Sequence, residues 1–282
     1  MKPLRSFWRV FWSDRRAAAA AVFLLVEILL VLLLPLFLGQ DPNVTDRTAG
    51  FWAPPSPAHL LGTDEIGRDV LTRLLYGGRV SLAVGILASL AGIVIGVVLG
   101  AVAGFYGGKV DAVIMRITDV IMCFPFFVVA IVLAAIVGPS MVNLIFIIAI
   151  LEWTKIARIV RAEVLSLKER DFITASRSMG LNEFEIILRH ILPNTFASIM
   201  VFATLAIANG ILTEAALSFL GMGVRPPQPS WGNMLAAAQS MRVLQYEWWL
   251  WIPQGFMVFI TVISINFLGD GLRDALDPKL KT

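Results

Sequence analysis

Residues 80–105, VSLAVGILASLAGIVIGVVLGAVAGF, form a stretch without a single charged side chain. An α-helix rises about 1.5 Å per residue, and about 20 apolar residues are enough to cross the hydrocarbon core of a bilayer. Residues 248–268 form a second uncharged stretch, which would be about 32 Å long as a helix. Both stretches therefore predict membrane-spanning helices.

The composition extends this prediction to the whole chain. Hydrophobic residues make up 58% of the 282 positions and charged residues 15%, against roughly 45–50% and about 25% in soluble domains. Residues 120–151 are uncharged but too long for one crossing, and Gly138, Pro139 and Ser140 divide them. Residues 17–38 and 196–220 each contain one acid, Glu27 or Glu214, which costs only about 2.5–3.5 kcal/mol on insertion scales.

We therefore expect an all-α, polytopic transmembrane bundle that occupies residues 17–268. About six spans are expected, near residues 17–38, 80–105, 118–137, 141–160, 195–220 and 248–268. Residues 161–194 then form a loop between spans four and five.

The positions of the basic residues predict the orientation. Most of the 23 Lys and Arg residues lie in or beside residues 1–16, the second connection, residues 161–194 and residues 269–282. The other connections contain only Arg47, Arg68, Arg73, Arg79, Arg225 and Arg242. Because cytoplasmic loops are enriched in Lys and Arg, we expect both termini and the loop 161–194 to be cytoplasmic.

The residues that carry enzyme chemistry are sparse. Cys123 is the only cysteine and lies in an apolar run, and His59 and His190 are expected on opposite faces of the membrane. No G-x-x-x-x-G-K-[ST] phosphate loop occurs in the sequence. We therefore expect no catalytic, cofactor-binding or metal-binding residues in this chain, and an intramembrane enzyme is disfavoured.

Small residues recur at every fourth position in residues 80–105, at Ala88, Gly92, Gly96, Gly100 and Gly104. In a helix this spacing places them on one face, where another helix can approach closely. The pattern favours a helix-packing face, and a Gly-rich membrane composition without that role is the alternative.

The loop 161–194 contains signals for two short helices. Asp171 is expected to cap a helix that runs to Met179, with Gly180 in the left-handed position after it and Leu181 as the apolar contact. Asn182 is expected to cap a second helix, with Glu185 three residues later. A DNA-binding helix-turn-helix has a similar outline, but membrane spans on both sides argue against a nucleic-acid partner.

This loop resembles the cytoplasmic coupling loop of binding-protein-dependent ABC importers, whose pattern is Glu-Ala-Ala, three residues, Gly, nine residues, Ile-x-Leu-Pro. The corresponding residues here are Thr174-Ala175-Ser176, Gly180 and His190-Ile191-Leu192-Pro193, of which Gly180, Leu192 and Pro193 fall at the expected spacing. The first glutamate, the second alanine and the isoleucine of the pattern are absent. A salt bridge from that glutamate is therefore not expected.

Further segments extend the resemblance over residues 7–279. They are residues 59–64 (HLLGTD), 67–71 (GRDVL), 214–221 (EAALSFLG), 226–227 (PP), 231–232 (WG) and 268–278 (LGDGLRDALDP). Together they are similar to the C-type permease of the dipeptide, oligopeptide and nickel importer family. The resemblance implies a permease subunit of an ATP-binding-cassette importer in the cell inner membrane, which forms half of a translocation pathway.

The resemblance also implies partners and roles. The partners would be a homologous B-type permease, two cytoplasmic ATPases that hold ATP and Mg²⁺, and an extracytoplasmic solute-binding protein. The residues implied to couple to the ATPases are Thr174, Ala175, Ser176, Arg177, Gly180, Leu192 and Pro193.

The sequence leaves two questions open. Glu214 either lines the solute path or makes a structural hydrogen bond, and the solute is a dipeptide, an oligopeptide, a glutathione-like molecule or a nickel chelate. The alternative function is an ion-gradient-driven secondary transporter, which would place ionisable residues or broken helices in mid-membrane.

Overall fold

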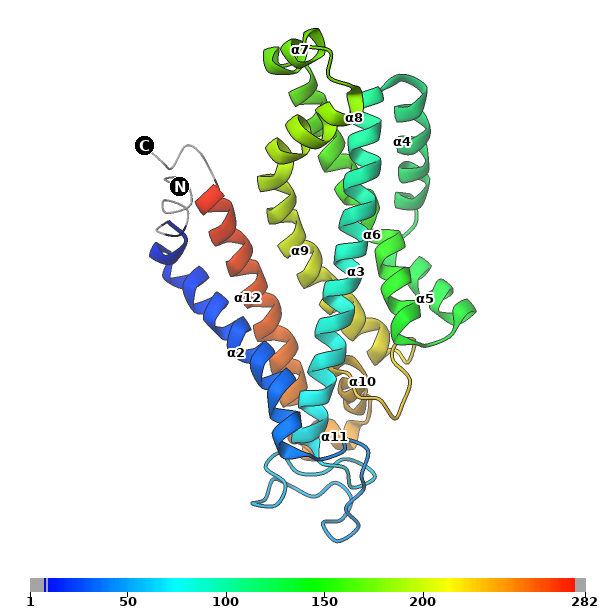
Figure 1. Ribbon diagram of the computed structural model, residues 1–282. Helices are drawn as coiled ribbons and strands as arrows, with labels where there is room; N and C mark the ends of the chain where they lie inside the picture. The colour runs from blue at the N-terminus through cyan, green and yellow to red at the C-terminus, as the bar shows by residue number, and fades with distance from the viewer. Residues whose placement is uncertain (1–7, 9, 277–282) are drawn as a thin grey trace.

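The computed structural model describes residue 8 and residues 10–276, and within these the chain is a bundle of helices (Figure 1). The long helices are α2 (Arg15–Leu38), α3 (Val70–Tyr106), α6 (Met141–Lys168), α9 (Leu192–Phe219) and α12 (Ile252–Leu276). The shorter ones are α4 (Gly108–Met122), α5 (Phe126–Val137), α7 (Asp171–Ser178), α8 (Glu183–Ile186), α10 (Trp231–Leu235) and α11 (Met241–Tyr246). Most basic residues of the predicted terminal segments, among them Lys2, Arg5, Arg9, Lys279 and Lys281, lie outside the described residues.

Four helical segments of the described chain are long and apolar enough to cross a membrane: α2 (to Phe37), α3, the continuous run Glu183–Phe219, and α12. The pair α4 and α5 passes the same test together but is bent by 86°, which gives up to five spans. Length and composition thus give four to five spans where about six are expected. The predicted span 141–160 lies on α6, whose Glu152, Lys155 and Arg158 make it less apolar than these four segments.

Two helix limits differ from the predicted spans. α3 begins at Val70, ten residues before the uncharged stretch, because Asp69 caps it by accepting a hydrogen bond from Thr72 N at 2.7 Å. α12 begins at Ile252, after a 3₁₀ turn at Trp248–Leu250, and continues to Leu276. The residues 269–276 that we expected in the tail are therefore helical.

The glycine stripe is the contact between α3 and α6, which confirms the predicted packing face. A Cβ atom built at Gly96 would lie 2.8 Å from the carbonyl oxygen of Trp153, and one at Gly100 would lie 2.5 Å from that of Ala157. At Gly104 the nearest atom would be the carbonyl oxygen of Arg161, at 2.9 Å. No side chain fits at these positions, so the two backbones pack directly against each other.

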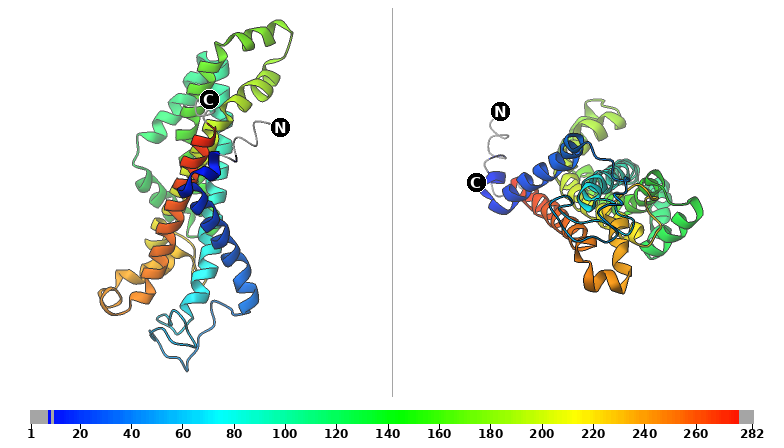
Figure 2. Two further views of the ribbon diagram at one scale, coloured as in Figure 1. Left: turned by 90° about the vertical axis from the view of Figure 1, so that its left-hand side faces the viewer. Right: turned by 90° about the horizontal axis from the view of Figure 1, so that it is seen from below.

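The α2 and α12 helices pair beside this centre, and the view from below shows them on the side away from α5 (Figure 2, right). The Arg15 end of α2 and the Leu276 end of α12 lie together, where Ala17 and Ala275 are fully buried with Phe11. In the middle of the pair, Thr261 Oγ1 donates a hydrogen bond to Glu27 Oε1 at 2.5 Å. Glu27 is thus buried as a helix–helix contact rather than exposed to lipid.

Arg79 of α3 donates hydrogen bonds to main-chain carbonyl groups of α2 near Pro35. Pro35 lies inside α2 and has no N–H group, so the carbonyl oxygen of Val31 lacks its usual donor. Arg79 Nε donates to Val31 O at 2.8 Å, and its Nη2 donates to Leu32 O at 2.7 Å. The guanidinium therefore joins α3 to α2 by hydrogen bonds to main-chain oxygens.

The connection 39–69 is a folded loop at the end of the bundle opposite α7 (Figure 1). His59 joins its two halves, with Nδ1 2.8 Å from Asp69 Oδ2 and Nε2 3.4 Å from Asp46 Oδ2. Hydrogen bonds from the side chain and backbone of Thr48 lower the pKa of Asp46 to about 2. Asp46 is therefore ionised beside His59 at neutral pH.

Candidate functional site

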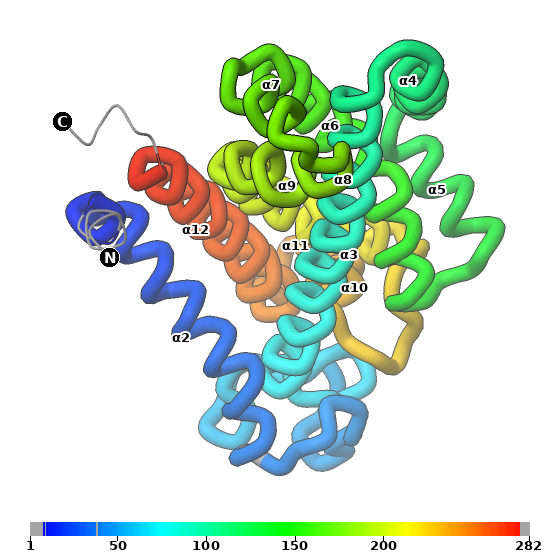
Figure 3. Tube along the Cα trace, turned by 45° about the horizontal axis from the view of Figure 1, so that its top comes forward, coloured from blue at the N-terminus to red at the C-terminus, as the bar shows by residue number. Residues whose placement is uncertain are grey.

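The most distinctive site is the elbow formed by α7, α8 and the residues between them, which projects from the bundle beside the end of α3 (Figure 3). Gly180 follows α7 in the left-handed conformation that the sequence predicts, with φ 83°. Its N–H bonds to Arg177 O at 3.0 Å, and Leu181 N bonds to Ser176 O at 3.3 Å. This is the Schellman pattern of helix termination, which turns the chain sharply at this point.

The two helix starts differ in how they are capped. Asn182 Oδ1 accepts a hydrogen bond from Glu185 N at 2.8 Å, as its position predicts. The prediction for Asp171 is wrong: Arg170 occupies the N-cap and makes no side-chain cap, and Asp171 is the first residue of the helix. Its carboxylate still favours the helix, because a negative charge in the first turn interacts well with the helix dipole.

One face of the elbow is packed on the bundle. Ile173, Ile186 and Ile191 are each fully buried and belong to one apolar cluster with Phe105 of α3 and Val164 of α6. Ser176 is also buried, and its Oγ donates to Phe172 O at 2.8 Å. The elbow is thus held in place by side chains of the long helices.

The other face of the elbow presents apolar side chains to the surroundings. The exposed fractions are 72% for Met179 and 68% for Phe184, and Phe172 and Leu188 are also exposed. Thr174 and Ala175 lie on this exposed side as well. A Cβ atom added at Gly180 would meet nothing within 4 Å, so the outer side of the turn is open.

Phe105, at the end of α3, lies between two cations of the loop. Lys168 Nζ is 5.6 Å from the centre of its ring, and the Arg177 guanidinium is 5.4 Å from it. Lys168 Nζ also donates a hydrogen bond to Phe105 O. Arg177, which we expected at the coupling surface, therefore also contacts α3.

The elbow continues into α9 through an irregular segment. Residues Ile187–Ile191 form a π-helical turn, and Leu192 and Pro193 begin α9. Since Pro193 has no N–H group and follows helical residues, it removes one main-chain hydrogen bond from this continuous helical run. π-Helical turns occur often at functional sites.

Glu214, the candidate for the solute path, is fully buried in α9. Its two carboxyl oxygens accept hydrogen bonds from Ser81 Oγ and Ser218 Oγ, both at 2.7 Å. Ser81 Oγ in turn accepts from Trp231 N of α10 at 3.0 Å. In this conformation the carboxyl group joins α3, α9 and α10.

Sequence analysis did not single out Phe105, Lys168 or the buried Glu152. Phe105 reads as the last apolar residue of a span and Lys168 as one of many cytoplasmic cations. Phe105 and Lys168 meet because the end of α6 lies beside the end of α3, and local sequence patterns do not encode this arrangement. For Glu152 the available signal is an acid between Leu151 and Trp153, directly after the uncharged stretch 120–151.

Comparison with known proteins gives consistent results. A family model described as the inner membrane component of binding-protein-dependent transport systems matches residues 96–282. A glutathione transport system permease protein from Pectobacterium atrosepticum is 44% identical, over 99% of this chain and 92% of its own length. A di/tripeptide transport system permease protein from Pseudomonas aeruginosa is 39% identical, over 99% of this chain and 93% of its own.

The fold has a match among solved structures. An inward-facing structure of the MetNI methionine ABC transporter aligns with a TM-score of 0.61 at 20% identity. The alignment covers 73% of this chain and 98% of the matched chain. At this level of identity the match concerns the arrangement of the helices.

Proposed function

Since the chain belongs to the family of inner membrane components of binding-protein-dependent transport systems, we propose that it forms half of the translocation pathway of an ATP-driven importer. The solutes proposed are peptides or similar small molecules, because relatives at 44% and 39% identity are named for glutathione and for di- and tripeptides. These names favour this function over the ion-gradient-driven alternative. The protein is then a transport subunit rather than an enzyme.

The observation that carries this proposal is the two-sided elbow. Ile173 and Ile186 anchor it to α3 and α6, while Met179 and Phe184 expose apolar surface on the outer side. Exposed apolar patches of soluble regions mark contacts with other proteins. We assign this surface to a partner ATPase, with Thr174, Ala175, Ser176, Arg177, Gly180, Leu192 and Pro193 as the coupling residues.

The contacts at Phe105 connect the elbow to α3 and provide a route by which movement of the ATPase reaches the long helices. A displacement of α7 moves Arg177 and, through the Lys168–Phe105 contact, the end of α3. Because α3 is in direct backbone contact with α6 along the glycine stripe, the two helices move as one unit. The proposed result is that ATPase closure shifts the paired helices that form the core of the bundle.

The proposed partners follow from the family description and from the sequence. A binding-protein-dependent system requires an extracytoplasmic solute-binding protein, and a second, homologous B-type permease would complete the pathway. Since this sequence contains no phosphate loop, ATP and Mg²⁺ are assigned to two ATPase partners. We place the chain in the cell inner membrane with both termini and the elbow in the cytoplasm, and assign Glu214 to the interior of the bundle that borders the solute path.

Reconstitution tests the proposed energy source. We expect the purified chain alone to show no ATP hydrolysis, and the complex with its ATPase partners in vesicles to take up a labelled dipeptide only when ATP is present. The binding protein is supplied on the side opposite the ATPases. Uptake by the lone chain in ATP-free vesicles under an ion gradient would instead establish the secondary transporter.

Cysteine labelling tests the proposed orientation. In a Cys123→Ser background, Ala58→Cys and Ser240→Cys should react with a membrane-impermeant maleimide added to intact cells, and Ser166→Cys should react only after lysis. All three positions are exposed, so access depends on the side of the membrane. Labelling of Ser166→Cys in intact cells would invert the orientation.

A further inference from the structure

Lys155 of α6 is a charged side chain near the middle of the bundle. Its neighbours Trp153 and Ile156 contact Gly96 of α3, where an added Cβ would lie 2.8 Å from Trp153 O and 2.7 Å from Ile156 Cβ. Gly96 is about 5 Å along the helix from the midpoint of the uncharged stretch 80–105. Lys155 therefore lies within the depth of the hydrocarbon core that this stretch crosses.

The side chain of Lys155 is exposed, although residues 151–154 and 156–157 on either side of it are buried. Its Nζ atom lies 5.9 Å from the centre of the Phe126 ring. Within the described residues it takes part in no hydrogen bond or ion pair. A lysine that faces lipid at the centre of a helix costs about 2.5–3.5 kcal/mol on insertion scales, so the ammonium group requires water or an anion.

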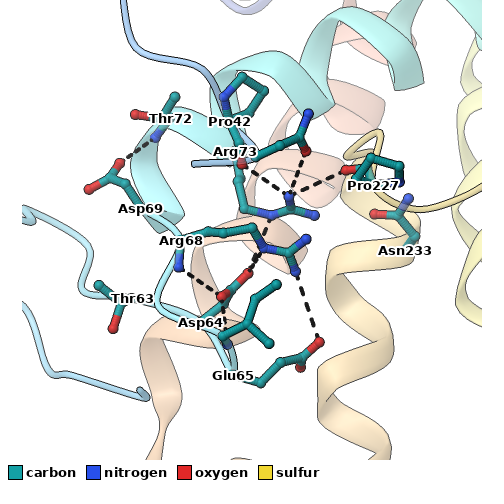
Figure 4. A network of polar contacts seen from close by, with 12 residues as sticks. Pro42, Thr63, Asp64, Glu65, Arg68, Asp69, Thr72, Arg73, Pro227 and Asn233 are labelled. Atoms are coloured by element: carbon teal, nitrogen blue, oxygen red, sulfur yellow. Dashed lines mark hydrogen bonds and ion pairs between the residues drawn. The ribbon is translucent and has the colours of Figure 1, made fainter. Parts of the chain in front are cut away.

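Other cations of the bundle have partners. Arg158, one turn further along α6, forms an ion pair with Asp119 of α4. At the end of the bundle opposite the elbow, acidic and basic side chains balance one another around a cavity of about 240 Å³. Figure 4 shows Arg68 and Arg73 there, and both contact Asp64. Lys155 differs from these arginines because none of its contacts in the described chain is with an acidic oxygen.

Glu152, three residues before Lys155, counters this charge only in part. Glu152 is 5% exposed, and its Cβ would lie 3.6 Å from a Cβ added at Gly92 of α3. No ion pair joins Glu152 to Lys155. The acid is thus enclosed between α6 and α3, while the ammonium group is on the open side of α6, where an approaching molecule meets a positive charge.

The main chain beside Lys155 is irregular. α4 ends at Met122 and α5 begins at Phe126, and the two helices are bent by 86° (Figure 1). Cys123 and Phe124 lie in the break and are exposed. Because lipid cannot hydrogen-bond to main-chain groups, non-helical backbone at this depth is tolerated where protein covers it or where it lines a water-filled space. A water-filled space would satisfy both this backbone and the lysine.

We propose that the α4–α5 bend, residues 122–126, borders the mid-membrane part of the solute path, and that Lys155 presents its ammonium group there to the carboxylate of a passing peptide. The inference rests on the proposed importer function and names a side chain that the solute meets at mid-depth. It also gives a reason for the charges of α6, since they face water. The competing occupant is an acidic side chain of the second permease, which would close the bend to water.

Cys123 is a natural probe of this space, because it is the only cysteine of the chain and is exposed at the bend. In an ATP-free complex in nanodiscs, with cysteine-free partners, we expect it to react with the anionic sulfonatoethyl methanethiosulfonate. The control is Val94→Cys in a Cys123→Ser background, an exposed apolar position two residues from Gly96. It should react about a hundredfold more slowly, because apolar surroundings suppress the reactive thiolate.

Lys155→Met tests the charge at the bend. The variant should slow the reaction of Cys123 with the anionic reagent about threefold or more, and leave the reaction with neutral methyl methanethiosulfonate unchanged. Since Lys155 makes no hydrogen bond in the described chain, assembly of the complex should not change. The matched control is Lys109→Met, an exposed cation in the first turn of α4, which should have no effect because it lies more than about 10 Å away, beyond the range of screened charges.

Transport provides a second readout with the same binding protein throughout. Lys155→Glu should lower the uptake of the acidic dipeptide Ala-Asp relative to that of the basic dipeptide Ala-Lys about threefold or more. Lys155→Arg, which keeps the charge, should retain the ratio of the parent. An unchanged ratio in Lys155→Glu would remove Lys155 from the solute path.

The remaining outcomes separate the path from the importer function. Unreactive Cys123, or equal rates for Cys123 and Val94→Cys, would overturn the proposal, because the bend would then be covered by a partner or would not differ from an apolar face. Labelling is measured without ATP, so it does not depend on transport. Absence of ATP-driven uptake by the parent complex would refute the importer function even if Cys123 reacts as expected.

Discussion

Gly180→Asp is expected to abolish solute uptake while the protein still inserts into the membrane at normal levels. Gly180 has φ 83°, a conformation in which a residue with a Cβ atom is destabilised by about 1 kcal/mol or more. The turn is open on its outer side, so the larger effect comes from a charge placed on the proposed apolar docking surface. The measurements are uptake and co-purification of the ATPases at matched expression.

Two further variants separate these causes. Gly39 has φ 60° and open space around it, so Gly39→Asp imposes a similar backbone cost and the same charge at a position outside the elbow. It should leave ATPase binding intact. Gly180→Asn, which tolerates the left-handed conformation, should retain most uptake. Normal uptake by Gly180→Asp would remove the coupling role from the elbow.

Gly100→Ala is expected to lower the stability of the protein more than a Gly→Ala substitution at any other position of the glycine stripe. The new Cβ would lie 2.5 Å from the carbonyl oxygen of Ala157 and 3.0 Å from its Cα. Both are main-chain atoms, so relief requires α3 and α6 to separate. Overpacking of this kind costs about 1–3 kcal/mol, which corresponds to a fall in thermal midpoint of about 2–10 °C.

The control for this variant lies eight residues earlier on the same face. A Cβ at Gly92 would have its nearest contact at 3.4 Å, with the carbonyl oxygen of Ala149, so Gly92→Ala should change the midpoint by less than half as much. The measurement is thermal unfolding of the detergent-solubilised complex. Equal stability of the two variants would show that α3 and α6 are not packed as closely as described.

Features encoded in short segments could be predicted from the sequence. The glycine stripe and the Gly180 turn each depend on residues within a few positions of one another, and the structure has both. The Asp171 cap was wrong by one residue, because an acid at the first helical position and an acid at the N-cap have the same sequence signature. Helix limits are similarly uncertain where charged residues continue a helix beyond its apolar stretch, as in α3.

Features that join distant segments could not be predicted. Arg73 and Gln254 border one cavity although nearly the whole bundle separates them along the chain. Phe105 meets Arg177 only because the elbow folds back over the end of α3. Charge patterns predict Arg73 and Arg177 on opposite faces of the membrane but do not identify their partners. Such pairings follow from tertiary packing, which a single sequence does not reveal.

The contact between Pro35 and Arg79 has a consequence for biogenesis. During synthesis α2 enters the translocation machinery first, with the Val31 carbonyl lacking its intrahelical donor, and an unsatisfied main-chain group costs several kcal/mol in hydrocarbon. The complementary guanidinium arrives only with α3, and a lone arginine is itself costly in the bilayer. We therefore expect the two helices to be most stable when both are inserted, because Arg79 then supplies the donor that Val31 lacks and α2 supplies main-chain acceptors for the guanidinium.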